Sequence, residues 1–231
     1  MDSRFREVFP DGHVVLPVIH VGSEDQALSN AGIAFGAGAN GAFLINHSMG
    51  SAELLAIHAR VAAAFPGCWL GVNCLDMDPV QVVRRVSADV AGIWSDNAMI
   101  KESEERQPEA DEVLAAIRET GWPGLYFGGV AFKYQRLVDD LGAAARIAGR
   151  YMDVVTTSGA GTGQAAHLEK IDAMKAGLGD LLLAIASGIT PENVRDYLPI
   201  SDCHLVATGI GDSFEALNPS KVSALVDVVR D

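Results

Sequence analysis

Cysteine is scarce in this chain, and its scarcity excludes several classes of protein. Only Cys68, Cys74 and Cys203 occur among the 231 residues, and they are odd in number and form no CxxC pair. Three such cysteines are too few for a disulfide framework, so we expect buried free thiols and a reducing compartment. The HxH, HExxH and CxxC spacings are all missing, which argues against a structural zinc site.

Positive charge and long apolar runs are also in short supply. The chain has 17 Lys and Arg against 30 Asp and Glu, a net charge of −13. Nucleic-acid binding requires clustered basic residues, so we expect no nucleic-acid partner. The opening stretch MDSRFREVFP lacks an apolar leader, and no run approaches the roughly 18 apolar residues of a membrane span. These absences predict an acidic, soluble, cytoplasmic protein without a transmembrane segment.

What the chain does contain is a regular alternation of short apolar runs and helical patterns. With 49% hydrophobic residues it can bury the core of one domain. Parallel strands need helical crossovers and read as continuous apolar runs, so the alternation indicates βαβ units. Eight units fit a closed (β/α)8 TIM barrel over residues 1–231, with an N-terminal extension at 1–12, better than the alternative of an open doubly wound sheet. The predicted strands are 14–19, 42–46, 69–73, 91–95, 125–132, 153–157, 181–186 and 204–208.

Polar residues gather where these strands end, which is where barrels of this kind carry their chemistry. They are His20, Asn46, His47, Asn73, Asp76, Asp96, Asn97 and Lys133. Lys133 follows the apolar run LYFGGVAF, so loss of solvation could make it a base or an amine nucleophile, while a salt bridge to Asp96 is the structural alternative. His20 can serve as an acid, a base or a metal ligand, or simply bond a neighbouring loop.

We take Lys133, His20, Asp96 and Asn46 as the catalytic candidates. No cofactor is indicated, although Mg²⁺ bound through Asp76 or Asp96 stays open.

Three loops rich in glycine and hydroxyl groups follow the last three strands: TTSGAGTGQ at 156–164, then SGITPENV and ATGIGDSF. Barrels often bind phosphate on such loops, because glycines let backbone N–H groups approach the anion. Thr190 as a helix N-cap followed by Pro191 would also form without any ligand. The predicted phosphate-binding residues are Ser158, Gly159, Thr162, Gly163, Ser187, Gly188, Thr208 and Gly209.

The chain resembles the BtpA/SgcQ family of predicted TIM-barrel proteins. The resemblance rests on VIH, LIN, GVN and AFK at the ends of strands 1, 2, 3 and 5, and on SGAGTG, SGITPENV and VATGIGDSF. Ala207 stands where the family usually has glycine, a lysine soon afterwards is missing, and the loop after strand 1 is short. The family implies a barrel and a presumed enzyme of unsettled reaction, and one member is linked to photosystem I biogenesis. Its recurrent rim positions fall on His20, Asn46, Asn73, Lys133, Ser158, Gly159, Thr162, Gly163, Ser187, Gly188 and Asn193.

Two functions follow from these observations. The first is an enzyme that acts on a small phosphorylated metabolite, a sugar or ribosyl phosphate, by isomerase or lyase chemistry next to a carbonyl. The second is a non-catalytic BtpA-like assembly or stability factor that uses an outer face of the barrel. The polar segment 97–112 is either a lid over the site or a solvated surface element, and a homo-oligomer stays open.

Overall fold

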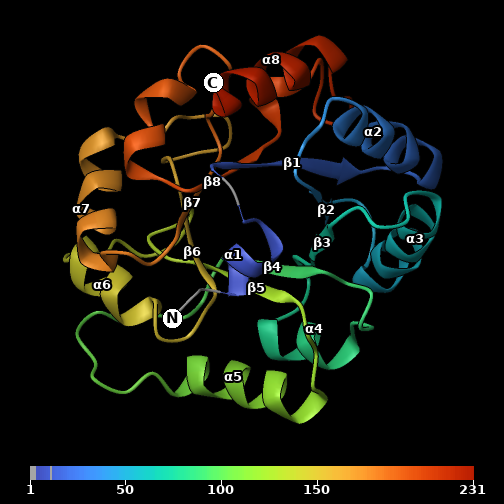
Figure 1. Cartoon of the computed structure of the whole chain (residues 1–231). Helices are drawn as coiled ribbons and strands as arrows, with labels where there is room; N and C mark the ends of the chain where they lie inside the picture. The colour runs from blue at the N-terminus through green and yellow to red at the C-terminus, as the bar shows by residue number, and fades with distance from the viewer. Residues whose placement is uncertain (1–3, 11) are drawn as a thin grey trace.

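The computed structural model describes residues 4–10 and 12–231, and its core is a closed barrel of eight parallel strands in the order β1 to β8. Looking along the barrel axis, Figure 1 shows the helices as an outer ring around these strands. The strands are Val14–Val21 (β1), Ala42–Asn46 (β2), Leu70–Asn73 (β3), Gly92–Ser95 (β4), Leu125–Gly129 (β5), Val154–Ser158 (β6), Leu183–Ala186 (β7) and Cys203–Val206 (β8). The predicted single-domain (β/α)8 barrel is therefore confirmed.

In the described chain an α-helix of the ring follows each strand except β7. These helices are Glu24–Gly36 (α2), Ser51–Ala64 (α3), Pro79–Arg85 (α4), Pro108–Thr120 (α5), Leu141–Ala148 (α6), Leu168–Leu178 (α7) and Pro219–Arg230 (α8), with the short helix Arg4–Val8 (α1) before β1. Side chains cap several of their first turns: Asp78 accepts a hydrogen bond from the backbone N–H of Gln81, and Asp140 one from that of Ala143. Proline opens α4, α5 and α8, where its missing N–H has no partner to lose.

Several predicted elements differ from the structure, and three of the differences bear on the site. β5 ends at Gly129, not at 132, because Ala131 has a positive φ of 49° and turns the chain, so Lys133 lies in a loop. β8 ends at Val206, which places Thr208 in the 3₁₀ turn Thr208–Ile210 (η3). Between β7 and β8, where the alternation predicts a helical crossover, the chain forms a pair of 3₁₀ turns, Val194–Asp196 (η1) and Leu198–Ile200 (η2), the second of which contains a proline.

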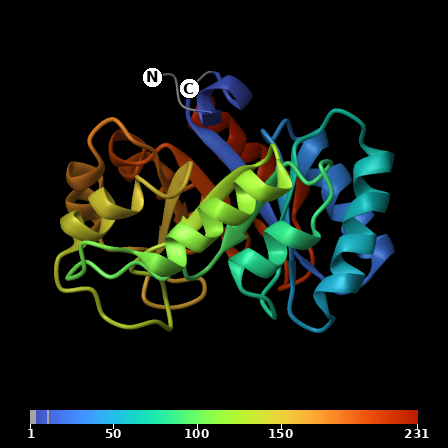
Figure 2. The same ribbon diagram turned by 90° about the horizontal axis from the view of Figure 1, so that it is seen from below.

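The barrel interior is a packed core, and α1 closes it at the end where the strands begin. Phe5 of this helix is completely buried, and its ring lies 6.2 Å from that of Phe127. Phe9 packs edge-on against Trp69 at 5.4 Å. Figure 2 shows α1 and the C-terminus at one end of the barrel, with the long loops that follow the strands at the opposite end. A ligand can therefore approach the barrel axis from the loop end, while aromatic side chains fill the other.

Two further expectations concern buried cysteine thiols and the absence of a membrane-spanning segment. Cys74 and Cys203 are buried as free thiols, but Cys68 is exposed, because it lies in the turn that leads into β3. Within residues 4–10 and 12–231, no helix is long and apolar enough to cross a bilayer.

Candidate active site at the mouth of the barrel

The two-residue period of each strand decides which polar side chains face the barrel axis. Val14, Leu16 and Val18 of β1 belong to the interior cluster, and so do Phe43 and Ile45 of β2. The same alternation points the next side chains of these strands, at positions 20 and 47, toward the axis. Applied to every strand, it brings His20, His47, Asn73, Asp96 and Ser158 to the mouth of the barrel.

His20 and His47 form one side of this mouth together with Phe214. The rings of His20 and His47 are 4.9 Å apart, and Phe214 lies 3.9 Å from the ring of His20. Burial, followed by the charge of His47, lowers the pKa of His20 to about 4, so this imidazole is neutral at pH 7. Its Nδ1 atom is buried and has no hydrogen-bond partner among the described residues. A neutral imidazole can act as an acid or a base toward a substrate.

Asp96 is held at the mouth by contacts to its side chain and to its backbone. Asn73 Nδ2 donates to its carboxylate at 2.9 Å, and Gln135 Nε2 donates to its backbone carbonyl at 2.5 Å. Burial raises the pKa of Asp96, while Asn73 and Lys133 act in the opposite direction. This carboxyl therefore holds a proton more readily than an exposed aspartate.

Lys133 reaches across the mouth to the loop after β7. Its Nζ donates to Ser187 Oγ at 2.9 Å, and its backbone N–H donates to Ser158 Oγ at 2.8 Å. Burial lowers the pKa of Lys133, and the charge of Asp96 opposes that shift. The salt bridge considered as its structural alternative is not formed, since the ion pairs among the described residues do not include Lys133 with Asp96.

Backbone strain is concentrated at this end of the barrel. Among the described residues, the non-glycine positions with positive φ are Met99, Ala131, Tyr134 and Ser187, and all four lie in loops that follow strands. Ser187, with a φ of 86°, is also the residue that holds Lys133. Such conformations cost on the order of 1–3 kcal/mol each and cluster at functional sites.

Asn46 and Asp76 lie outside the mouth. Asn46 alternates outward from β2, and its Nδ2 donates to Asp76 at 2.8 Å and to the carbonyl of Met49 at 2.9 Å. Its carbonyl accepts the backbone N–H of Leu75 at 2.8 Å. Ser51 also bonds Asp76 through both its hydroxyl and its backbone N–H, and chiefly for this reason the pKa of Asp76 falls to about 2. These groups fix the loops after β2 and β3, and a catalytic role for Asn46 stays a prediction.

The three glycine-rich loops lie together on one side of the mouth; loop 6 is residues 159–167, loop 7 is 187–193 and loop 8 is 207–218. A Cβ atom on Gly188 would lie 2.2 Å from the backbone nitrogen of Ala165, and one on Gly209 would lie 1.9 Å from the carbonyl oxygen of Ile189. Loop 7 thus presses against loops 6 and 8. The close contacts between loops require glycine at these two positions. The sequence by itself suggests another reason for the glycines, which is the approach of backbone N–H groups to a ligand.

The predicted phosphate-binding residues differ in how far they can reach a ligand. Thr162, Gly163 and Thr208 are exposed, and Ser187 and Gly209 are half-buried. Gly159 and Gly188 are buried, and the buried Ser158 donates its hydroxyl to the carbonyl of Gly159 while accepting from Lys133. Loop 7 is tied by Asn193, which accepts from the backbone N–H of Thr190 and donates to the carbonyl of Gly188.

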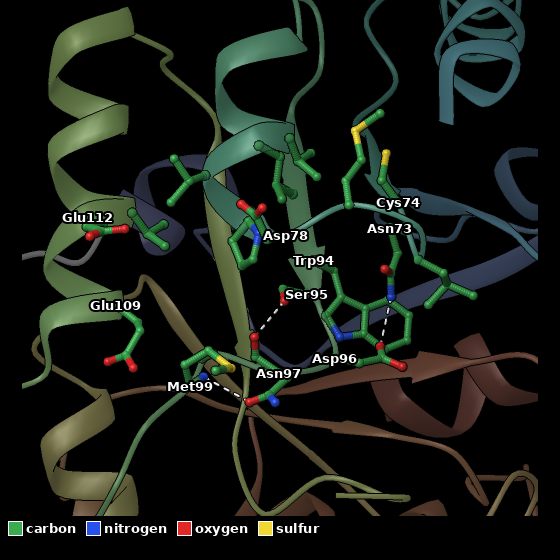
Figure 3. Close-up of a pocket in the computed structure, with 18 residues that line it drawn as sticks. Asn73, Cys74, Asp78, Trp94, Ser95, Asp96, Asn97, Met99, Glu109 and Glu112 are labelled. Atoms are coloured by element: carbon green, nitrogen blue, oxygen red, sulfur yellow. Dashed lines mark hydrogen bonds between the residues drawn. The ribbon is translucent and has the colours of Figure 1, made fainter. Parts of the chain in front are cut away.

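A cavity of about 400 Å³ adjoins the mouth between α4 and α5. Figure 3 shows Asn73 and Asp96 at its inner edge, with Asp78, Glu109 and Glu112 on the helix side. The remaining lining is mainly apolar. The cavity exists because α4 has only seven residues and covers less of the barrel than the helices beside it.

The segment 97–112 is folded against the barrel. Gln107 is buried and binds the backbone of Lys101 from both ends of its amide, and Glu102 forms an ion pair with Arg136 of the loop after β5. From Pro108 onward the segment is part of α5. The lid interpretation stays a prediction. Within the described part of the chain, no group of three or more His, Cys, Asp or Glu side chains is gathered to bind a metal.

Three residues of this face are not among the candidates that the sequence predicts: His47, which appears only in the general set of strand-end residues, Phe214 and Lys170. The alternation along β2 was the signal for His47. Phe214 and Lys170 lie in a loop and a helix with no periodic signal for their contacts.

No protein-family model and no curated protein matches the chain. The resemblance to the BtpA/SgcQ family is thus not confirmed and stays a prediction. Solved structures do match its fold. A tryptophan synthase structure from Mycobacterium tuberculosis is 15% identical, with a TM-score of 0.74 over 100% of both chains. Phosphoribosyl anthranilate isomerase from Thermus thermophilus is 17% identical, with a TM-score of 0.62 over 94% of this chain and 98% of that chain.

A native KDPGal structure is 16% identical, with a TM-score of 0.68 over 94% of each chain. At such identities the likeness shows the fold alone. By its closed strand order and these neighbours, the chain is a TIM-barrel protein.

Proposed function

We propose that the protein is an enzyme that converts a small phosphorylated metabolite, such as a sugar or ribosyl phosphate, by isomerase or lyase chemistry next to a carbonyl group. The observation that carries the proposal is the placement of Lys133. Its amine is half-buried at the mouth, is held by the strained Ser187, and has Asp96 as the carboxylate that acts on its pKa.

The opposite pKa shifts of Lys133 and Asp96 suit proton transfer. Burial lowers the pKa of the amine and raises that of the carboxyl, so the energy of moving a proton between them is smaller than in water. An amine that gives up its proton can attack a carbonyl carbon to form an imine with release of water, or remove a proton from the adjacent carbon. In this proposal the neutral imidazole of His20, across the mouth from Lys133, would accept or return the substrate proton.

The phosphate group would lie on loops 6, 7 and 8. Support comes from their mutual packing, which brings the exposed Thr162, Gly163 and Thr208 to the same side of the mouth. Backbone N–H groups rather than basic side chains would bind the anion, which suits a protein of net charge −13.

A screen of phosphorylated metabolites by thermal shift identifies the substrate class, since a ligand at 100 times its Kd stabilises by about 2.7 kcal/mol. With a substrate in hand, Lys133→Met should keep the fold and the ligand-induced stabilisation but lower turnover by about 10²–10⁴-fold or more. Borohydride should trap a carbonyl substrate on Lys133 if an imine forms, and add no mass if Lys133 only moves protons. Full activity in Lys133→Met would refute its role, and EDTA in the same assay measures any contribution of Mg²⁺.

The alternative, a non-catalytic BtpA-like assembly or stability factor, is favoured by one observation. Of the large hydrophobic residues that are exposed in the described chain, five lie on loops around the mouth: Leu75, Met99, Tyr134, Leu137 and Phe214. A partner protein docked over the mouth would cover them. Leu75→Glu separates the two functions, because Leu75 is exposed and lies in the loop after β3, away from loops 5 to 8: it should weaken partner binding by an assembly factor and leave turnover by an enzyme nearly unchanged.

A further inference from the structure

The five lysines of the chain differ in whether a carboxylate compensates their charge. Lys101, Lys175 and Lys221 each form an ion pair with an aspartate or glutamate. Lys133 has no such contact, but Asp96 acts on it from a distance. Among the described residues, no carboxylate contacts Lys170 or acts on its pKa, and the other four lysines all differ from it in this respect.

Lys170 is placed in the first turn of α7 with its side chain half-buried. Its Nζ donates to the carbonyl oxygen of Ala131 at 2.5 Å and to that of Ser158 at 2.7 Å. An ammonium group has three N–H donors, so one remains without a partner among the described residues. Burial lowers the pKa of Lys170 to about 8, which leaves the amine mostly charged at pH 7.

This uncompensated charge borders a cavity of about 330 Å³ between loop 6 and the loop after β5, residues 130–140, here called loop 5. Lys133, Tyr134, Ser158 and His167 line the same cavity. Tyr134 spans it, since its hydroxyl accepts the backbone N–H of Thr162 at 3.2 Å. His167 is the N-cap of α7 and makes no side-chain cap, so the N-terminal end of this eleven-residue helix adds further unpaired donors.

We propose that the cavity between loops 5 and 6 is an oxyanion subsite in which Lys170 binds a phosphate or carboxylate group. A half-buried ammonium without a counter-charge is unfavourable unless a ligand supplies one. In a chain with 13 excess negative charges, carboxylate side chains are abundant, and none of those that the structure describes is placed against this lysine. The subsite adjoins the phosphate position proposed on loops 6, 7 and 8, and Ser158 and Gly159 border both.

The inference rests on the proposed function only for its consequence: the substrate would carry a second anionic group in addition to its phosphate. Because Lys133 lines the same cavity, an anion bound by Lys170 would fix the carbonyl part of that substrate close to the Lys133 amine.

Titration calorimetry with inorganic phosphate, at constant ionic strength set with chloride, tests the subsite. Lys170→Met should weaken phosphate binding about 10- to 100-fold, the range of a lost hydrogen bond to a charged group. Lys175→Met is the matched control, because it removes an equal charge from the same helix but leaves the cavity intact; its affinity should stay within about twofold of wild type. Wild-type affinity in Lys170→Met, or no phosphate binding by the wild-type protein, would overturn the proposal.

Thr208→Val separates this subsite from the proposed function. If Thr208→Val loses phosphate binding and Lys170→Met retains it, the subsite is wrong and the phosphate position on loops 6, 7 and 8 stands. The reverse result supports the subsite and removes phosphate from those loops.

A second measurement covers the case in which Lys170→Met does not fold. Reductive methylation with ¹³C-formaldehyde gives each lysine an NMR signal, and the signal of Lys170 is the one missing in Lys170→Arg. Phosphate should raise the pKa read from that signal by about 1. An unchanged pKa at saturating phosphate would refute the subsite.

Discussion

Gly188→Ala tests how tightly loop 7 presses against loop 6. Gly188 has a φ of +74°, and a Cβ atom there would lie 2.2 Å from the nitrogen and 2.3 Å from the Cα of Ala165. The positive φ costs a non-glycine residue roughly 1–2 kcal/mol. Forcing the methyl group against backbone adds roughly 1–3 kcal/mol, because backbone cannot rotate out of the way as a side chain can. The free energy of unfolding should therefore fall by about 2–5 kcal/mol.

Gly121→Ala is the matched control. Gly121 ends α5 in the left-handed conformation, with a φ of +65°, and a Cβ atom there would meet nothing within 4 Å. It should lose only the conformational part, roughly 1–2 kcal/mol. Urea unfolding followed by tryptophan fluorescence measures both variants. Equal losses would refute the packing argument, because the close approach of loops 6 and 7 would then contribute nothing.

Two further predictions concern titration and thiol chemistry. Burial lowers the pKa of both His20 and His204 to about 4, so each is protonated in the unfolded chain near pH 6.5 but not in the folded one. The contribution of these histidines to the free energy of unfolding is then complete above about pH 6.5 and falls by up to about 1.4 kcal/mol per pH unit for each histidine as the pH drops toward 4. His204→Gln should make this pH dependence shallower. An unchanged slope would contradict the lowered pKa of His204. Of the three cysteines only Cys68 is exposed, so Ellman's reagent should find one fast-reacting thiol in the native protein and three in the denatured protein. A second fast thiol in the folded protein would be inconsistent with the burial of Cys74 and Cys203. A fast phase that survives Cys68→Ser would be inconsistent with it too.

The barrel was predictable from the sequence because its strands are buried on both faces. Runs such as AFLIN at 42–46 are apolar without interruption, and that run coincides with β2. The errors occur where a single φ angle or a short turn decides the outcome. The run LYFGGVAF is apolar throughout, but the positive φ of Ala131 ends the strand early, and no propensity of alanine predicts such a conformation.

The candidate site was predictable only as a set of strand ends. Sequence position places Lys133 and Ser187 at the mouth, but the 2.9 Å contact between them depends on the strained backbone of loop 7. Lys170 could not be found in this way, because its contacts to Ala131 and Ser158 join a helix to two loops. Contacts of this kind depend on how close two loops come together, which apolar periodicity does not encode.

The choice between Asn46 and His47 shows where more could have been extracted from the sequence. Both follow the apolar part of β2, and the sequence analysis selects Asn46 as the catalytic candidate. Within AFLIN the residues at 43 and 45, one aromatic and one β-branched, fill the barrel interior. The residue two positions further, His47, must therefore face the axis, and Asn46 must face outward.

Replacing each residue by alanine tests this rule. Asn46→Ala should lower the free energy of unfolding by about 1–3 kcal/mol, because Asp76 and the backbone N–H of Leu75 lose their hydrogen-bond partner, and it should change the chemistry little. His47→Ala should leave stability nearly unchanged, since the ring is exposed, and alter turnover through the pKa of His20. Urea titration measures stability, and a pH profile of turnover measures the chemistry. If instead Asn46→Ala altered the pH profile and His47→Ala lowered stability, alternation along β2 would not determine which side chains reach the substrate.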